Sequence, residues 1–172
     1  EASIIDKKSK FTWVVDPIDG TSNFANGVVT YGIIIGLLEN AIPVAGGFAL
    51  PAFSEIYTAE KGLGAFLNGK IITINNDKRN LLSELVAWGI DGRQENPQIT
   101  RGECNQLADI VLGIRNLRAN GSVFDTAMVL KSKFGAQAVL RGKIWDIAGL
   151  DILVTEAGGI CTDFYGNPID YK

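Results

Sequence analysis

The chain has 172 residues, of which 47% are hydrophobic and 20% are charged, and its formal net charge is −3. These values predict one globular domain with a proper hydrophobic core and argue against a nucleic-acid-binding surface. The chain contains no histidine, so a Ser-His-Asp triad, a Cys-His nucleophile and a histidine-ligated zinc site within it are excluded.

The two cysteines, Cys104 and Cys161, form no disulfide framework. Neither is followed six positions later by arginine, which argues against a cysteine phosphatase loop. No apolar run reaches transmembrane length and no signal peptide is recognised, so we expect a cytoplasmic protein that does not enter a membrane. The remaining candidates for chemistry are carboxylates, hydroxyls, lysines and a bound metal.

The stretch 13–24 joins a strand pattern to a polar turn. Three apolar residues predict the end of a buried strand, and Pro17, which lacks an N–H, should end it. Asp16 and Asp19 then lie at the strand end and in the turn, where a short helix could begin after Gly20. The spacing leaves two interpretations open. One is a structural Asp-Pro-x-Asp-Gly turn, and the other is a hard-cation site, because paired carboxylates and a free carbonyl suit Mg²⁺.

The next third of the chain reads as consecutive strands. Apolar segments over 31–38 and 42–50 and an alternating one over 54–59 predict an antiparallel meander, with an Asn-Gly hairpin turn at 68–69. The glycines of this hairpin do not make a dinucleotide fingerprint, because no helix follows them.

The second half alternates between strand and helix patterns. We expect, in order, a strand over 82–88, a polar loop over 91–102, a helix over 104–112, a loop over 116–121, a helix from a Ser122–Asp125 capping box to Gly135, a strand over 136–140, a helix from Asp146 to the Gly-Gly pair at 158–159, a strand over 160–164 and a turn over 165–168. For Asp146, the ordinary role at a helix start is that of an N-cap.

Two stretches of the chain resemble the signatures of the inositol monophosphatase family. The first is Asp-Pro-Ile-Asp-Gly-Thr-Ser-Asn-Phe at 16–24, and the second is Trp-Asp-Ile-Ala-Gly at 145–149 followed by Glu-Ala-Gly-Gly at 156–159. The hairpin at 61–69 also looks like that of this family, and the three matches occur in the family's order over nearly the whole chain.

The resemblance implies a layered α-β-α-β-α sandwich with mixed sheets, of the α+β or α/β class, in a single domain over 1–172. The family's N-terminal helices and C-terminal elements would be missing from this chain. We therefore expect apolar sheet faces to be exposed unless a partner or further segments cover them.

The chemistry implied is hydrolysis of a small-molecule phosphate monoester by a water held on Mg²⁺, with two or three ions bound. Carried over by motif, Asp16 would bridge two ions, and Glu1 and the carbonyl of Ile18 would bind the first. Asp19 and Asp146 would complete the second. Two cations close together can stabilise both the entering hydroxide and the leaving oxygen.

The same resemblance assigns the remaining roles. The catalytic residues would be Glu1, Thr21 and Asp19, with Thr21 and Glu1 paired to orient the attacking water. Backbone N–H groups of Gly20 and Thr21 would hold phosphate oxygens. The substrate-binding residues would be Asp19, Gly20, Thr21, Gly121, Ser122, Val123 and Asp146.

The substrate is the least specified part of the prediction. Inositol monophosphate or a related sugar or polyol phosphate comes first, but Val139 stands seven residues before Asp146, where inositol-specific members often carry a substrate-binding glutamate. Fructose 1,6-bisphosphate, histidinol phosphate and 3′-phosphoadenosine 5′-phosphate stay open. The Asp-x-Asp spacing of haloacid-dehalogenase phosphatases is absent at Asp16 and Asp19.

The competing class is a member of the family that binds metal or a partner without turnover. The presence of all three aspartates, Asp16, Asp19 and Asp146, favours an enzyme. We further expect a homodimer and no nucleic-acid partner.

Overall fold

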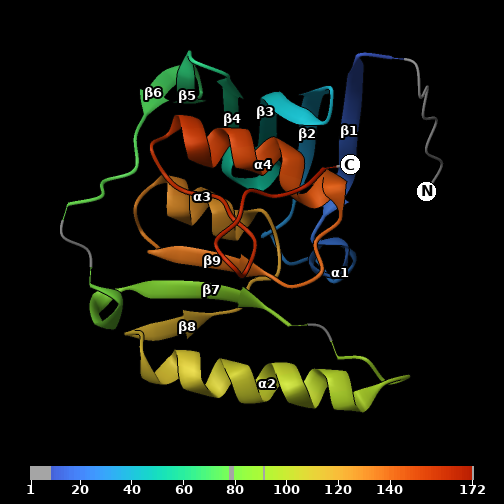
Figure 1. The fold of residues 1–172 in the computed structure, drawn as a ribbon, viewed down its shortest axis with the longest axis vertical. Helices are drawn as coiled ribbons and strands as arrows, with labels where there is room; N and C mark the ends of the chain where they lie inside the picture. The colour runs from blue at the N-terminus through green and yellow to red at the C-terminus, as the bar shows by residue number, and fades with distance from the viewer. Residues whose placement is uncertain (1–8, 78–79, 91, 172) are drawn as a thin grey trace.

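The computed structural model describes residues 9–77, 80–90 and 92–171. Two sheets stack with helices between them and below them (Figure 1). The larger sheet is an antiparallel meander whose strands lie in chain order: β1 (Phe11–Asp19), β2 (Gly32–Glu39), β3 (Ile42–Leu50), β4 (Glu55–Glu60), β5 (Gly64–Leu67) and β6 (Lys70–Ile72). The smaller sheet is parallel, in the order β8 (Asn116–Arg118), β7 (Leu85–Gly89) and β9 (Ala136–Val139).

Four helices and two 3₁₀ turns accompany these sheets in the described residues. The helices are α1 (Thr21–Ala25), α2 (Pro97–Leu112), α3 (Phe124–Leu130) and α4 (Ile144–Glu156), with single 3₁₀ turns at Pro51–Phe53 and Leu81–Ser83. In Figure 1, α3 and α4 lie between the two sheets, and α2 covers the far side of the smaller one. The expected α+β sandwich is therefore confirmed, with one antiparallel and one parallel sheet in the described residues.

The alternation of side chains in the large sheet decides which face packs against α4. Ile34 and Leu38 of β2 are 1% exposed, whereas Ile33 and Ile35 point to the other face and are half exposed. Strand side chains alternate with a period of two, so the inner face continues through the paired strands into one core with α4.

The outer face of the large sheet remains apolar and exposed in the described part of the chain. Trp13 is 63% exposed, and Val15, Ile33, Ile35 and Ile56 are also exposed and share this face by register. An exposed apolar face was expected from the resemblance, and the described residues place no helix on it. None of the described helices combines the length and apolarity needed to cross a membrane.

Close backbone packing holds α4 against the large sheet. A Cβ on Gly149 would lie 2.4 Å from the carbonyl oxygen of Ile35, and a Cβ on Gly46 would lie 2.5 Å from the carbonyl oxygen of Gly149. Only glycine permits this approach of helix to sheet. The position of α4, and of every side chain on its first turn, therefore depends on these glycines.

Several predicted elements were wrong in their details. Strand β1 does not end before Pro17 but continues to Asp19, because it is an edge strand and a register shift removes the need for a Pro17 N–H. Helix α2 begins at Pro97, inside the predicted polar loop, with the proline at a position where no N–H is needed. Strand β8 was missed within a predicted loop.

Three further differences lie in the last third of the chain. Helix α3 ends at Leu130, short of Gly135. The stretch 160–164 forms no strand. The predicted N-cap, Asp146, lies instead three residues into the capping sequence: helix α4 has Lys143 as its N-cap, and the Asp146 carboxylate accepts a hydrogen bond from the Lys143 N–H at 2.6 Å.

Candidate active site

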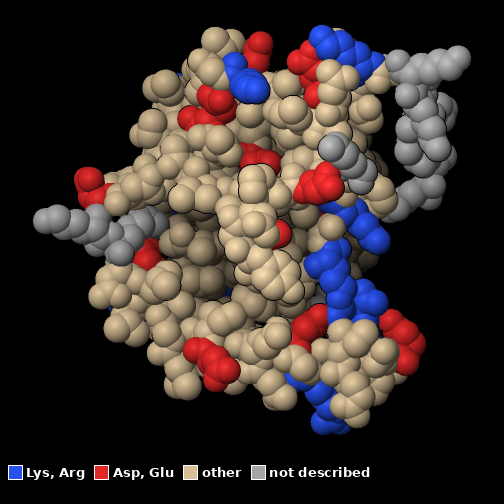
Figure 2. Space-filling model, viewed as in Figure 1, with Lys and Arg blue, Asp and Glu red and all other residues tan. Residues whose placement is uncertain are grey.

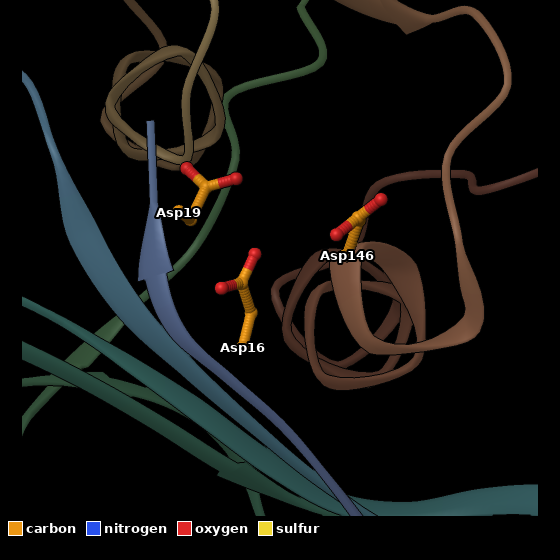
Figure 3. A group of neighbouring side chains, drawn as sticks. All are labelled: Asp16, Asp19 and Asp146. Carbon is orange, nitrogen blue, oxygen red and sulfur yellow. The ribbon is translucent and has the colours of Figure 1, made fainter. Parts of the chain in front are cut away.

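Three carboxylates meet where β1 ends and α4 begins. One carboxylate oxygen from each of Asp16, Asp19 and Asp146 lies within 4.8 Å of the others (Figure 3). Asp16 and Asp19 belong to β1, and Asp146 belongs to the first turn of α4, 127 positions beyond Asp19. The fold thus brings the two signature stretches into one cluster.

A bulge lets Asp16 and Asp19 share one side of the strand. Residues three apart in a regular strand point to opposite faces. Here Asp16 pairs with Ile34 and Asp19 pairs with Gly32, so β1 contains one more residue than β2 over the same length. The extra residue turns Asp19 back toward Asp16, and the N–H of Ile18 caps the Asp16 carboxylate at 3.1 Å. Pro17, which interrupts the ladder, is the local cause.

The electrostatics of the cluster favour a bound cation. Burial raises the pKa of Asp19 from 3.8 to about 7, the N–H of Val123 opposes this rise, and the charges of Asp16, Asp146 and Asp125 add to it. Neighbouring carboxylates that disfavour the charged form of Asp19 make an environment that a divalent cation neutralises. All the donors are oxygens, which suits a hard cation such as Mg²⁺.

A second layer of contacts connects the first signature to the stretch 120–125. The Asp19 carboxylate accepts a short hydrogen bond from the Val123 N–H, across 104 positions of sequence. Gly20 has φ +78°, and a Cβ there would lie 2.9 Å from the Cβ of Ser122. The Gly-Ser-Val segment at 121–123 therefore lies directly against the turn that carries Asp19.

Side-chain amides hold this segment in place. Asn23 of α1 donates to the carbonyl oxygens of Thr30 and Asn120, both at 2.8 Å. The Asn120 amide in turn donates to the Asp125 carboxylate at 2.6 Å. Asp125 is 1% exposed, and burial raises its pKa while hydrogen bonds from Asn120 and nearby backbone N–H groups lower it.

These positioning contacts were not found from the sequence. The sequence shows Asn23 only as part of the first signature and predicts Asp125 as half of a capping box. The available signal was a buried-strand pattern followed by several short polar side chains, which does not reveal partners about 100 positions away. The hydrogen bonds from Asn23 to Asn120 and from Asn120 to Asp125 fix the wall beside the cluster of three aspartates.

The cluster opens into a cavity of about 280 Å³. Its lining includes Asp19, Asp125 and Asp146, the segment 120–123, and residues that follow the strands of the small sheet. The carboxyl ends of β7, β8 and β9 meet at this edge because the three strands are parallel. Such an edge is where ligands commonly bind in sheets of this kind.

The predicted water-orienting pair is only half described. The Thr21 hydroxyl, in the first turn of α1, donates to the Ile18 carbonyl oxygen at 2.8 Å. That carbonyl keeps a second lone pair, so the contact does not prevent it from binding a metal. Glu1 lies outside the described residues, and its pairing with Thr21 stays a prediction.

With this geometry in view, the comparisons with known proteins decide the family. The model of the "Inositol monophosphatase family" matches residues 1–172. The chain belongs to the inositol monophosphatase family. The resemblance stated from the two signatures and the hairpin is confirmed.

Relatives within the family carry several names. A fructose-1,6-bisphosphatase/inositol-1-monophosphatase of Aquifex aeolicus is 32% identical over 155 residues, which are 90% of this chain and 58% of that protein. Inositol monophosphatase 2 of Solanum lycopersicum is 34% identical over 161 residues, covering 92% of this chain and 60% of that protein. The chain therefore spans less than two thirds of the length of these curated relatives.

Solved structures agree with the fold. The extragenic suppressor protein suhB from Bartonella henselae matches with a TM-score of 0.84 and 30% identity over 97% of this chain and 64% of that one. An inositol monophosphatase from Anabaena matches with a TM-score of 0.84 and 26% identity over 96% of this chain and 65% of that one.

The family's second signature contains two acids with different surroundings. Glu156 ends α4, and its two carboxylate oxygens accept hydrogen bonds from the N–H groups of Gly62 at 2.8 Å and Gly64 at 2.9 Å. The glycine-rich hairpin therefore binds a side chain of the same protein. This contact joins the hairpin at 61–69 to the end of the second signature.

Proposed function

We propose that the full-length protein hydrolyses a small phosphate monoester in a reaction that depends on Mg²⁺. The observation that carries the proposal is the convergence of Asp16, Asp19 and Asp146 from two family signatures. Mg²⁺ held there would lower the pKa of a bound water and neutralise phosphate charge. Two or three ions are proposed.

The proposed roles of the chain's own residues follow the cluster. Asp16 would contact two ions, the Ile18 carbonyl and Glu1 one ion, and Asp19 and Asp146 the other. The exposed hydroxyl of Thr21 lies in the turn beside the cluster. With Glu1, it would orient a water and accept its proton.

The substrate would lie in the cavity beside the cluster. The N–H groups of Gly20 and Thr21 would bind phosphate oxygens, and the segment 121–123 would contact the part of the substrate that leaves. The cavity volume of about 280 Å³ suits a small molecule. Inositol monophosphate or another sugar or polyol phosphate is proposed first. Fructose 1,6-bisphosphate, histidinol phosphate and 3′-phosphoadenosine 5′-phosphate are the alternatives.

A screen of these phosphate monoesters with the full-length protein tests the proposal. We expect release of inorganic phosphate with Mg²⁺, and no release when EDTA replaces the metal. Phosphate release that persists in EDTA would contradict the metal mechanism. Metal binding without turnover of any ester would instead favour the non-catalytic class. The proposed homodimer is tested separately by light scattering, and the proposed cytoplasmic location by fractionation of cells.

A further inference from the structure

The acidic cavity has one basic residue in its wall. Among the described residues that line it, Arg141 is the single Lys or Arg. It lies in the loop between β9 and α4, where Figure 2 shows Lys and Arg side chains gathered on the surface. Cations bound by Asp16, Asp19 and Asp146 would offset the charge of that cluster, and Arg141 would then provide a positive group near a further anion.

The place of Arg141 in the fold points to the non-reacting part of a substrate. Parallel strands β7, β8 and β9 are followed by Ile90, Asn120 and Arg141 at the carboxyl edge, and all three line the cavity. Asp146 lies five residues after Arg141, on the first turn of α4. A molecule with its phosphate at the aspartates therefore extends toward the strand ends that include Arg141.

An ion pair positions the guanidinium of Arg141 without using all of its donors. The Nη2 atom of Arg141 contacts Oε1 of Glu103 on α2 in a close salt bridge. The side chains are 33% and 13% exposed, respectively. A guanidinium has five N–H donors in a fixed plane, so one carboxylate contact leaves donors for a second anion.

The wall next to Arg141 includes an apolar side chain at the end of β9. Val139, the last residue of β9, lines the same cavity, is 39% exposed and carries no polar side-chain atom. A carboxylate at this position would attract hydroxyls and repel anions. Valine does neither, so Arg141 sets the charge preference of this side of the cavity.

We propose that Arg141 is a specificity-determining residue that binds a second anionic group, a phosphate or a carboxylate, on the leaving part of the substrate. This inference rests on the proposed function, because it assumes that the reacting phosphate binds at the three aspartates. The preferred substrate is then a phosphate monoester with a second negative group, ahead of a neutral polyol monophosphate.

Two pairs of substrates isolate the second anion. Fructose 1,6-bisphosphate and fructose 1-phosphate differ by one phosphate, and 2-phosphoglycerate and glycerol 2-phosphate differ by one carboxylate. For the full-length protein, the ratio of kcat/KM within each pair measures the preference, and the two pairs distinguish phosphate from carboxylate. We expect a preference for the member with the second anionic group in at least one pair.

The variant Arg141→Gln should lower that ratio at least about tenfold, corresponding to about 1.4 kcal/mol, by raising KM for the substrate that carries the second anionic group. Arg141→Lys keeps the charge and should retain most of the preference. Arg115→Gln is the matched control. It removes the same charge at an exposed position just before β8, at the end of that strand away from the cavity. An unchanged ratio in Arg141→Gln, or an equal loss for both members of a pair, would overturn the proposal.

A binding measurement separates this inference from the proposed function. Calorimetry with Ca²⁺ in place of Mg²⁺ reports the affinities for both members of each pair without requiring turnover. If no ester is hydrolysed, the proposed function fails, yet a tenfold fall in the affinity ratio in Arg141→Gln would still support the anion site. Hydrolysis with no charge preference in either measurement would reject Arg141 and leave the proposed function standing.

Discussion

The two ends of α4 carry acids that look alike in the sequence and differ in their surroundings. At the C-terminal end, Glu156 receives two backbone N–H groups from the 62–64 hairpin. At the N-terminal end, the Asp146 carboxylate accepts a hydrogen bond from the Lys143 N–H and lies within 4.8 Å of two further carboxylates. Glu156 is satisfied by the protein itself, whereas the group around Asp146 carries excess negative charge that a cation can neutralise. An acid's neighbours, rather than its place in a motif, indicate whether it is structural or functional.

The largest effect is expected from replacing the carboxylates at the N-terminal end of α4. We expect Asp146→Asn, and likewise Asp16→Asn, to lower Mg²⁺-dependent hydrolysis by at least about a thousandfold, because the metal supplies several kcal/mol of transition-state stabilisation. The fold should persist, since asparagine can still accept the Lys143 N–H. Asp109→Asn, at an exposed position on α2, is the control that should retain full activity. Full activity in Asp146→Asn would remove this residue from the metal site.

The contact between α4 and the sheet supports both ends of the helix. Gly149→Ala would place a Cβ 2.4 Å from the Ile35 carbonyl oxygen, so α4 must shift. We expect a loss of about 1–3 kcal/mol in the free energy of unfolding and weaker Mg²⁺ binding, measured by denaturation and calorimetry. Gly113→Ala is the matched control, since its Cβ would meet only the Ile110 carbonyl oxygen, at 3.5 Å. An unaltered metal affinity in Gly149→Ala would show that Asp146 does not depend on this packing.

The contact of Glu156 at the C-terminal end of α4 can be removed without changing the three aspartates. Glu156→Gln removes the charge from two hydrogen bonds and leaves one of the two N–H groups facing an amide N–H₂. We expect a loss of about 1.5–3 kcal/mol in the free energy of unfolding, with Mg²⁺ affinity unchanged. Glu60→Gln, an exposed substitution on β4, should change stability by less than about 0.5 kcal/mol. If Glu156→Gln lost Mg²⁺ binding and kept normal stability, Glu156 would be a functional rather than a structural acid.

Thr21 tests whether a satisfied hydroxyl can still be functional. It donates to the Ile18 carbonyl, as a structural residue would, yet it lies in the turn beside the cluster. We expect Thr21→Ala to lower kcat at least about tenfold, equivalent to about 1.4 kcal/mol of barrier, with little change in Mg²⁺ affinity. Thr21→Ser should retain activity. Normal kcat with weaker metal binding would return Thr21 to a structural role.

Asp19 accepts a backbone N–H and also lies among the clustered carboxylates. Its titration should make the free energy of unfolding depend on pH. Its pKa of about 7 is higher than the ordinary 3.8, so the folded metal-free protein binds more protons than the unfolded chain between these values. Stability in EDTA should therefore fall as pH rises from about 4 to 7. Asp19→Asn should reduce this fall in urea denaturation. Mg²⁺ binding must displace the proton, so affinity should rise over the same range. A contribution of Asp19 with the opposite slope would contradict its raised pKa.

The sequence predicted the large sheet better than the small one, for a physical reason. From β2 to β6 the meander joins neighbouring strands through short turns, so alternation and an Asn-Gly pair determine both the strands and their pairing. In the small sheet, the three residues of β8 pair with β7 across α2, and so short a strand has no periodic signal. The absence of a strand at 160–164 is likewise a matter of pairing, which local pattern cannot reveal.

The sequence by itself determined the chemical types at the site and the family: the absence of histidine, the three aspartates and the two signatures are all visible in it. Tertiary structure decided which side chains meet. The bulge at Pro17 turns Asp19 toward Asp16, and the glycine contact of α4 brings Asp146 to them. It also assigned Glu156 to the hairpin, and Arg141 to the cavity wall and to Glu103. These contacts join residues tens of positions apart, and their distances depend on backbone packing that no local pattern specifies.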